Sequence, residues 1–267
     1  MNLKKSIIIC GIVGLVSCAK VPITGRKQMN LLPESEMMSL SLTSYRDFLS
    51  KNQTVAESDS RTQMVKRVGS NVSAAVQQFM LSNKKYADRV AGFNWEFNLV
   101  NDKTVNAWCM PGGKVVVYTG LLPVTQDESS LAVVLGHEIA HAIARHGNER
   151  MSQGLLVQAG GIGLAVATST KPEVTQSIFM QSYGVASTLG TLAYSRTHES
   201  EADKLGLVFM ALAGYDPSTA PAFWERMAAS SGGQAPPELL STHPSDATRI
   251  KDIRAFLPEA MKYYRPR

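Results

Sequence analysis

The sequence has few cysteines, no basic tract and no long apolar span. Its three cysteines are Cys10, Cys18 and Cys109. Once an N-terminal leader is removed and Cys18 is modified, as argued below, Cys109 is left alone, which excludes an intramolecular disulfide. The net charge of +5 is ordinary, and no basic stretch with interleaved aromatic residues indicates a nucleic-acid partner. The apolar run Gly154–Ala167 is short and glycine-rich, which favours a buried or lid-forming helix over a membrane span.

The segment His137-Glu138-Ile139-Ala140-His141 is an HExxH motif inside a run with helical character. Two histidines four residues apart project from the same face of a helix, so both imidazoles can bind one metal ion. Glu138 then lies beside the metal, where it can act on a water molecule. The flanking signals, a capping box from Thr125 to Glu128 and a stop at Gly147, predict one helix of about five to six turns.

A catalytic zinc site takes three protein ligands and leaves one position open, so a third ligand is needed. Ala144 and Gly147 stand where a metzincin would have glycine and histidine, which excludes that arrangement. The segment His198-Glu199-Ser200-Glu201-Ala202-Asp203 offers an acidic ligand on a second helix instead. Glu199 and Asp203 share one face, whereas Glu201 points away. We predict Glu199 as the ligand and Asp203 as the carboxylate that orients a zinc-bound histidine.

Four segments in this order resemble the HtpX, Oma and CAAX-prenyl-protease family of zinc metallopeptidases, from about Thr24 to the C-terminus. They are NAWCMPGGKVVVYTGLL, HEIAHAIARH, HESEADKLG and STHPSDATRI. The resemblance is strongest to the family's bacterial periplasmic lipoprotein branch. It implies one Zn²⁺ per chain on His137, His141 and Glu199, with Glu138 as the catalytic base.

The remaining histidines are His146, His198 and His243. We interpret His146 as structural, in the last turn of its helix, and His198 as a surface residue. Family relatives carry a histidine near the metal at the position of His243. It is therefore a candidate for stabilising the tetrahedral intermediate or for closing the open zinc position, and a purely structural role in its loop is the alternative.

The first residues have the pattern of a secretory signal peptide, with two lysines followed by a short apolar core. Leu15-Val16-Ser17-Cys18 resembles a lipobox, in which Cys18 becomes the acylated first residue of a bacterial lipoprotein; cleavage after Ala19 is the alternative. We expect a lipoprotein signal peptide at 1–17, a lipidated N-terminus and tether at 18–33, and a zinc metallopeptidase domain at 34–267. The expected location is the periplasmic face of the cell envelope, at the outer membrane.

The pattern of apolar residues predicts an α+β domain, mainly helical and of the zincin type, with a small β-sheet beside the HExxH helix. Helices are expected at 34–49 and 61–81, and strands at 93–99, 105–109 and 114–118. An edge strand above the zinc helix binds the substrate backbone in zincins generally. Our candidates for that strand are Asn106, Ala107 and Trp108.

These observations predict a membrane-anchored zinc endopeptidase that acts on unfolded or misassembled proteins of the cell envelope. The substrate class rests on the resemblance alone. The alternative is a latent or non-catalytic, chaperone-like lipoprotein that binds zinc. An intact Glu138 argues against that alternative, because a structural zinc has four protein ligands and needs no such carboxylate. The sequence does not indicate an oligomeric state.

Overall fold

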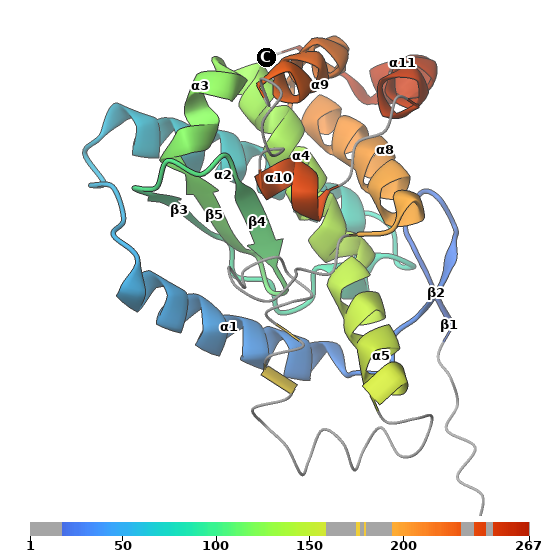
Figure 1. Cartoon of the computed structure of the whole chain (residues 1–267). Helices are drawn as coiled ribbons and strands as arrows, with labels where there is room; N and C mark the ends of the chain where they lie inside the picture. Colours follow the sequence, from blue (N-terminus) through green and yellow to red (C-terminus); the bar gives the residue numbers. More distant parts are fainter. Residues whose placement is uncertain are drawn as a thin grey trace, which may run out of the picture.

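The computed structural model describes residues 18–158, 175–176, 179, 194–230, 238–243 and 248–266. The predicted signal peptide and most of the apolar run 154–167 lie outside these ranges. The elements are β1 (Cys18–Lys20), β2 (Lys27–Met29), α1 (Glu34–Lys51), α2 (Ser60–Leu81), β3 (Glu96–Val100), β4 (Ala107–Met110), β5 (Lys114–Tyr118), α3 (Leu122–Thr125), α4 (Glu128–Ala144), α5 (His146–Gln158), α8 (Arg196–Leu212), α9 (Ala220–Ala229), α10 (Glu238–Thr242) and α11 (Arg249–Ala260). The predicted fold class is confirmed: helices surround a small sheet that lies beside the HExxH helix α4 (Figure 1).

The sheet has the strand order β3-β5-β4, with β3 parallel and β4 antiparallel to β5. Gly112 and Gly113 form the turn between β4 and β5, where both adopt φ values near +80° that glycine tolerates best. Strand β3 starts at Glu96, three residues later than the predicted strand 93–99. The amides of Asn94 and Glu96 bond to the carbonyls of this glycine turn, so the chain before Glu96 pairs with the turn and not with β5.

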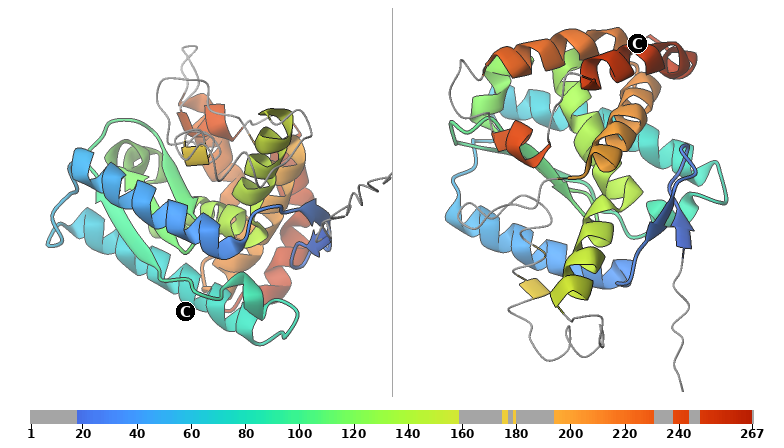
Figure 2. Two further views of the ribbon diagram at one scale, coloured as in Figure 1. Left: turned by 90° about the horizontal axis from the view of Figure 1, so that it is seen from below. Right: turned by 45° about the vertical axis from the view of Figure 1, so that its right-hand side comes forward.

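Alternation of side chains along the strands divides the core into two layers. Cys109, Val115 and Val117 face α2 and α4, whereas Trp108 and Val116 face α1. Figure 2 shows α1 on one side of the sheet and α2 on the other. The helical spacing of the valines in α2, all of them buried, confirms that predicted helix.

Helix α4 lies in the middle of the molecule, and every side chain from Ser130 to Ala144 is buried. Its boundaries differ from the prediction. Asp127 is the N-cap and accepts a hydrogen bond from the amide of Ser130 (2.7 Å), so no capping box from Thr125 forms. The helix ends because Arg145 adopts a left-handed conformation (φ 59°), and α5 begins at the next residue. The helix is therefore shorter than predicted, and Gly147 lies inside α5.

Strands β1 and β2 pair antiparallel, Cys18 with Met29, and form a ribbon together with the loop between them. We name residues 18–29 the N-terminal ribbon. The buried Arg89 holds it to the domain by donating to the carbonyl of Lys20 (2.6 Å) and to Gln28 Oε1 (3.0 Å). Most of the segment expected to be a tether is thus packed against the domain.

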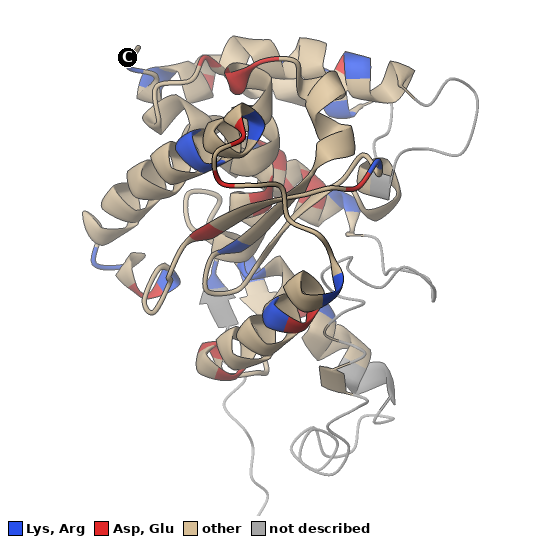
Figure 3. Ribbon diagram, turned by 90° about the vertical axis from the view of Figure 1, so that its left-hand side faces the viewer, with Lys and Arg blue, Asp and Glu red and all other residues tan. Residues whose placement is uncertain are grey.

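Charged residues of both signs are distributed over the helices of the face shown in Figure 3, and neither sign is gathered on one element there. This distribution agrees with the absence of a basic tract from the sequence. Among the described helices, none combines the length and the apolar character that a bilayer crossing needs.

Candidate metal centre

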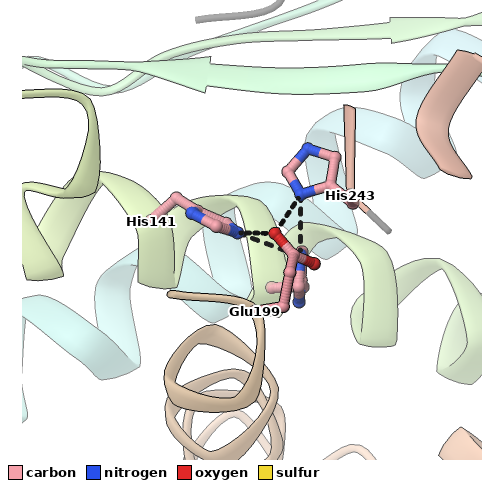
Figure 4. Close-up of side chains that lie close together, drawn as sticks. His141, Glu199 and His243 are labelled. Atoms are coloured by element: carbon pink, nitrogen blue, oxygen red, sulfur yellow. Dashed lines mark hydrogen bonds and ion pairs between the residues drawn. The ribbon is translucent and has the colours of Figure 1, made fainter. Parts of the chain in front are cut away.

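Four buried side chains from three separate segments converge beside the sheet. His137 and His141 come from α4, Glu199 from the first turn of α8, and His243 directly follows α10. One donor atom of each lies within 4.8 Å of the others. His141 Nε2 is 3.1 Å from His137 Nε2, and His243 Nδ1 is 3.0 Å from Glu199 Oε1. Figure 4 shows the side chains of His141, Glu199 and His243 pointing toward one another below the strands.

This donor set fits a divalent metal of the zinc type. Three imidazole nitrogens and one carboxylate are the ligands that zinc takes in tetrahedral sites. Glu199 Oε2 is buried without a hydrogen-bond partner, and it lies 3.4 Å from His137 Nε2. Burial alone would raise the pKa of Glu199, but the nearby imidazoles of His243, His137 and His141 hold that pKa well below its usual value. The carboxylate is therefore ionised and available to a cation.

The second nitrogen of His137 has the partner that the sequence predicts. His137 Nδ1 donates to Asp203 Oδ1 (2.9 Å), which leaves Nε2 free to face the other donors. Arg249 from α11 in turn binds Asp203 through Nε (2.9 Å) and Nη2 (2.7 Å), and its guanidinium stacks 3.5 Å from the ring centroid of Trp224. Burial would raise the pKa of Asp203, but Arg249 and His137 together hold it below its usual value. Arg249 thus faces the centre and not the surface.

Glu138, the predicted base, is buried next to the donor cluster. Its Oε1 atom has no hydrogen-bond partner and lies 3.5 Å from His243 Nε2. Burial raises the pKa of this carboxyl, an effect that the positive charges of His243 and His137 oppose. A carboxylate with a raised pKa is a stronger base than an exposed one, and an oxygen without a hydrogen-bond partner is open to a proton, as a general base requires.

Two other histidines lie in the interior as well. His198, expected at the surface, is buried, and its Nε2 atom bonds to Glu149 Oε2 (3.0 Å). His146, expected in the last turn of the HExxH helix, instead begins α5, and its Nδ1 atom lies 3.0 Å from His141 Nδ1. Glu199 therefore lies on the face of α8 that helical periodicity predicts, whereas His198 is buried because Glu149 on another helix provides a partner inside the protein.

Tyr194 is a residue of the centre that the sequence analysis did not identify. Its ring lies 4.0 Å from that of His141 and 5.1 Å from that of His243, between centroids. The guanidinium of Arg150 lies over the other side, 4.0 Å from the ring centroid. In the sequence, Tyr194 is marked only as an aromatic residue five positions before Glu199. No spacing rule connects such a residue with an HExxH motif.

The three residues predicted to bind substrate backbone lie at or next to β4, which is an edge strand among the described residues. Asn106 and Ala107 are buried, and the carbonyl of Asn106 accepts from the amide of Tyr118 (3.1 Å). The Trp108 side chain points into the α1 layer, where Nε1 donates to Tyr118 Oη (3.2 Å). Only main-chain groups on the outer edge of β4 can therefore take part in strand pairing.

Comparison with known proteins identifies the family of the chain. The model of peptidase family M48 matches residues 59–257.

The chain belongs to peptidase family M48.

Several curated relatives of this M48 chain are metalloendopeptidases by name. The mitochondrial metalloendopeptidase OMA1 of Schizosaccharomyces pombe is 40% identical over 173 residues, which are 64% of this chain and 49% of the relative. The bovine mitochondrial metalloendopeptidase OMA1 is 32% identical over 249 residues, 90% of this chain and 46% of that protein. The beta-barrel assembly-enhancing protease of Yersinia pestis is 33% identical over 170 residues, 60% of this chain and 34% of the relative. The M48 chain spans about half the length of the OMA1 relatives.

These relatives confirm the predicted family and contradict the predicted location. The outer-membrane, periplasmic location is wrong, because the relatives from yeast and cattle are mitochondrial by name. The bacterial relative from Yersinia pestis matches a smaller share of both chains. The physical reason for the error is that a basic, apolar leader indicates export from the site of synthesis and does not itself specify a destination.

The M48 centre depends on a close crossing of α4 and α8. A Cβ atom on Gly206 would lie 2.8 Å from the His137 backbone nitrogen, and one on Gly136 would lie 2.7 Å from the Gly206 carbonyl oxygen. The absence of both side chains lets α8 approach α4. Glu199 and Asp203, on the same face of α8 as Gly206, thereby reach His137.

We expect Gly206→Ala to separate the two helices. Overpacking of this kind lowers the free energy of unfolding by about 1–3 kcal/mol, and the shift of Glu199 and Asp203 should also weaken metal binding. Gly69→Ala is a matched control, because its new Cβ would meet the Phe97 ring in another part of the core. Thermal unfolding and zinc titration of both variants test this. Equal zinc affinities in the two variants would contradict the prediction.

Proposed function

We propose that this chain is a zinc-dependent endopeptidase. The observation that supports the proposal most directly is the convergence of His137, His141 and Glu199 with a buried Glu138 whose Oε1 atom has no partner. A site that only held metal would have no use for that free carboxylate beside the donors. The names of the family and of its relatives agree with this reading.

When bound, zinc supplies Lewis acidity to the scissile carbonyl and to the attacking water. His137, His141 and Glu199 would hold it, and Asp203 and Arg249 keep His137 oriented. Glu138 accepts the proton of the attacking water and delivers it to the leaving amine, as general base and then general acid. Burial of the whole cluster removes competing water and strengthens these electrostatic interactions.

We propose unfolded or misassembled proteins as substrates. The outer edge of β4, from Asn106 to Met110, would pair with an extended segment of the substrate, because strand addition reads main-chain groups. Since the side chains of Ala107 and Trp108 are buried in the protein, they cannot select particular substrate residues. Broad specificity for extended segments follows.

Cleavage of casein by residues 19–267 tests the proposal. The zinc-loaded protein is expected to cleave casein, the chelator-treated protein should not, and added zinc should restore cleavage. Absence of cleavage by a protein that holds one zinc would contradict the proposal and favour a latent or chaperone-like zinc protein.

A specific observation supports a latent state of the same site. His243 Nδ1 lies within 3.2 Å of both His137 Nε2 and Glu199 Oε1, at the place of a fourth ligand, and its Nε2 atom faces Glu138. A protein with four ligands on its metal has no position open for substrate. His243 would thus act as a latch that must move before the reaction begins.

We therefore expect His243→Ala to cleave casein faster than the wild type. A hydrogen bond to a charged group contributes about 1.5–3 kcal/mol, so removal of the latch should raise the rate roughly 10-fold or more. The double variant with Glu138→Gln is the control and should be inactive, which shows that the gained cleavage uses the same site. A decrease in rate would identify His243 as a catalytic helper instead.

We also propose, from Leu15-Val16-Ser17-Cys18, that Cys18 is acylated and attaches the chain to a membrane. Cys18 is the first residue of β1, so a lipid there would extend from one end of the N-terminal ribbon. Mass spectrometry of the purified full chain beside Cys18→Ser tests this, and an unmodified wild-type Cys18 would contradict it.

A further inference from the structure

The Nδ1 atom of His137 bonds to a carboxylate, whereas the Nδ1 atom of His141 bonds to another histidine. His141 Nδ1 lies 3.0 Å from His146 Nδ1, and His146 Nε2 lies 2.9 Å from Glu201 Oε2. The three side chains are at most 4% exposed. Glu201 therefore serves the same centre as Glu199, but from the opposite side of α8 and through one intermediate ring.

The direction of these hydrogen bonds fixes the state of His141. Glu201 acts as an acceptor, because Arg26 Nε and the Thr24 hydroxyl already donate to its two oxygens. His146 must then carry its proton on Nε2, so its Nδ1 atom accepts the Nδ1 proton of His141. This leaves the lone pair of His141 Nε2 facing Glu199 and His137, where a metal ligand needs it.

The carboxylate at the end of this chain is held by the N-terminal ribbon. Arg26 Nε donates to Glu201 Oε2 (2.8 Å), and the Thr24 hydroxyl donates to Glu201 Oε1. The other end of the same guanidinium makes a two-point contact with Glu149, at 3.0 and 2.8 Å. Because Arg26 is 23% exposed and its two carboxylate partners are 4% and 9% exposed, the contact is largely shielded from water.

The surroundings of Arg26 hold this arrangement in place. His198 binds the second carboxylate, Glu149, and its ring stacks on that of His146 with centroids 4.5 Å apart. The loop that carries Arg26 turns through left-handed conformations at Ile23 (φ 65°) and Gly25 (φ 69°). A non-glycine residue in that conformation stores strain that other contacts must offset. The hydrogen bonds of Thr24 and Arg26 with Glu201 are among these contacts.

Each α4 histidine is thus connected to a carboxylate that a guanidinium holds, His137 directly and His141 through the ring of His146. For His137 the guanidinium is that of Arg249, within the segment that matches the M48 model. For His141 it is that of Arg26, which lies before that segment, 175 residues from Glu201 in the chain. An N-terminal element outside the matched domain therefore completes the support of one metal ligand.

We propose that the N-terminal ribbon is a positioning element of the metal centre, in which Arg26 and Thr24 orient His141 through Glu201 and His146. This inference rests on the proposed metal site and adds a means of regulating it. Displacement of the ribbon, by force on residue 18 or by a partner that binds the ribbon, would release Glu201 and loosen His141. Metal affinity would then fall without any change in the ligands themselves.

Zinc affinity of the full chain with Arg26→Met tests the proposal. Loss of the partner of a metal-bound histidine weakens metal binding by roughly 10–100-fold, and we expect about 10-fold here because Arg26 acts through two residues. Arg26→Lys should recover part of the loss, since it keeps the charge but not the two-point geometry. Competition with a chromogenic chelator measures the affinities. The visible spectrum of the cobalt-substituted protein reports ligand geometry, and it should change in Arg26→Met.

Two controls separate positioning from general stability. Arg67→Met removes an exposed ion pair with Glu128 at the start of α4, and Val72→Ala removes buried methyl groups from α2. Both should keep the wild-type zinc affinity and cobalt spectrum, even if Val72→Ala melts at a lower temperature. If Arg26→Met does not fold, Thr24→Val provides a milder test, because it removes one hydroxyl donor to Glu201.

A zinc affinity and a cobalt spectrum identical to those of the wild type in Arg26→Met, or in Thr24→Val if Arg26→Met does not fold, would overturn the inference. These readouts do not depend on catalysis. If the wild type binds zinc but does not cleave casein, the proposed peptidase activity fails while the role of the ribbon is still decided. If the wild type binds neither zinc nor cobalt, both proposals are wrong.

Discussion

Glu138→Gln is expected to lower kcat for casein cleavage by roughly 10²–10⁴-fold, the contribution of a general base, while zinc remains bound. The carboxylate is buried, and its free Oε1 atom lies 3.5 Å from His243 Nε2. A glutamine has nearly the same shape but cannot accept the proton of the attacking water. Because Glu138 is not among the four converging donors, metal content should not change.

Glu128→Gln is the matched control for this experiment. It removes the same charge from the same helix, but at the exposed first turn, where the side chain pairs with Arg67. We expect it to cleave casein at the wild-type rate. Zinc content of all three proteins, measured by atomic absorption, accompanies the kinetics. Retained turnover in Glu138→Gln would remove Glu138 as the base.

Glu199→Ala should lose the metal itself. Glu199 provides the one carboxylate in the donor set, and its Oε1 atom lies 3.0 Å from His243 Nδ1 and 3.4 Å from His141 Nε2. Its removal leaves three neutral or positive rings without the negative charge that stabilises a cation among them. The loss of zinc affinity should exceed the roughly 10–100-fold that removal of a ligand's hydrogen-bond partner costs.

Asp203→Ala provides the comparison within the same helix, because Asp203 touches His137 Nδ1 and not the donor cluster. We expect its zinc affinity to fall within that 10–100-fold range, and hence less than in Glu199→Ala. Chelator competition gives both constants. Unchanged zinc stoichiometry in Glu199→Ala would exclude Glu199 as a ligand, and a larger loss in Asp203→Ala would reverse the two roles.

The parts of the centre that follow from helical periodicity were predictable from the sequence. His137 with His141, and Glu199 with Asp203, are pairs four residues apart, and the structure brings each pair onto one face of its helix. That the two pairs lie close to each other was predictable only because a catalytic zinc needs a third protein ligand. The glycine contact that permits this meeting, Gly136 with Gly206, has no signature in either helix taken alone.

The parts that depend on pairing between distant segments were not predictable. Glu201 was assigned to the far side of its helix, which is correct, but its partners there are His146 and Arg26. Nothing local to residue 26 indicates a buried ion pair. The end of α4 was likewise not predictable from the local sequence. Gly147 was the expected stop, yet Arg145 takes the left-handed conformation that glycine would adopt more easily.

The side chains of the candidate metal centre come from segments far apart in the sequence, so the ribosome synthesises them at different times. His243 meets His137 across 106 residues of chain, and Arg249 meets Asp203 across 46. Closing loops of that length is among the slower events of folding. A nascent chain that already displays HExxH therefore has no competent centre until its last helices have docked. At the proposed site, metal binding would thus come only after the last helices have docked, and the proposed peptidase activity would be absent from an incompletely synthesised chain.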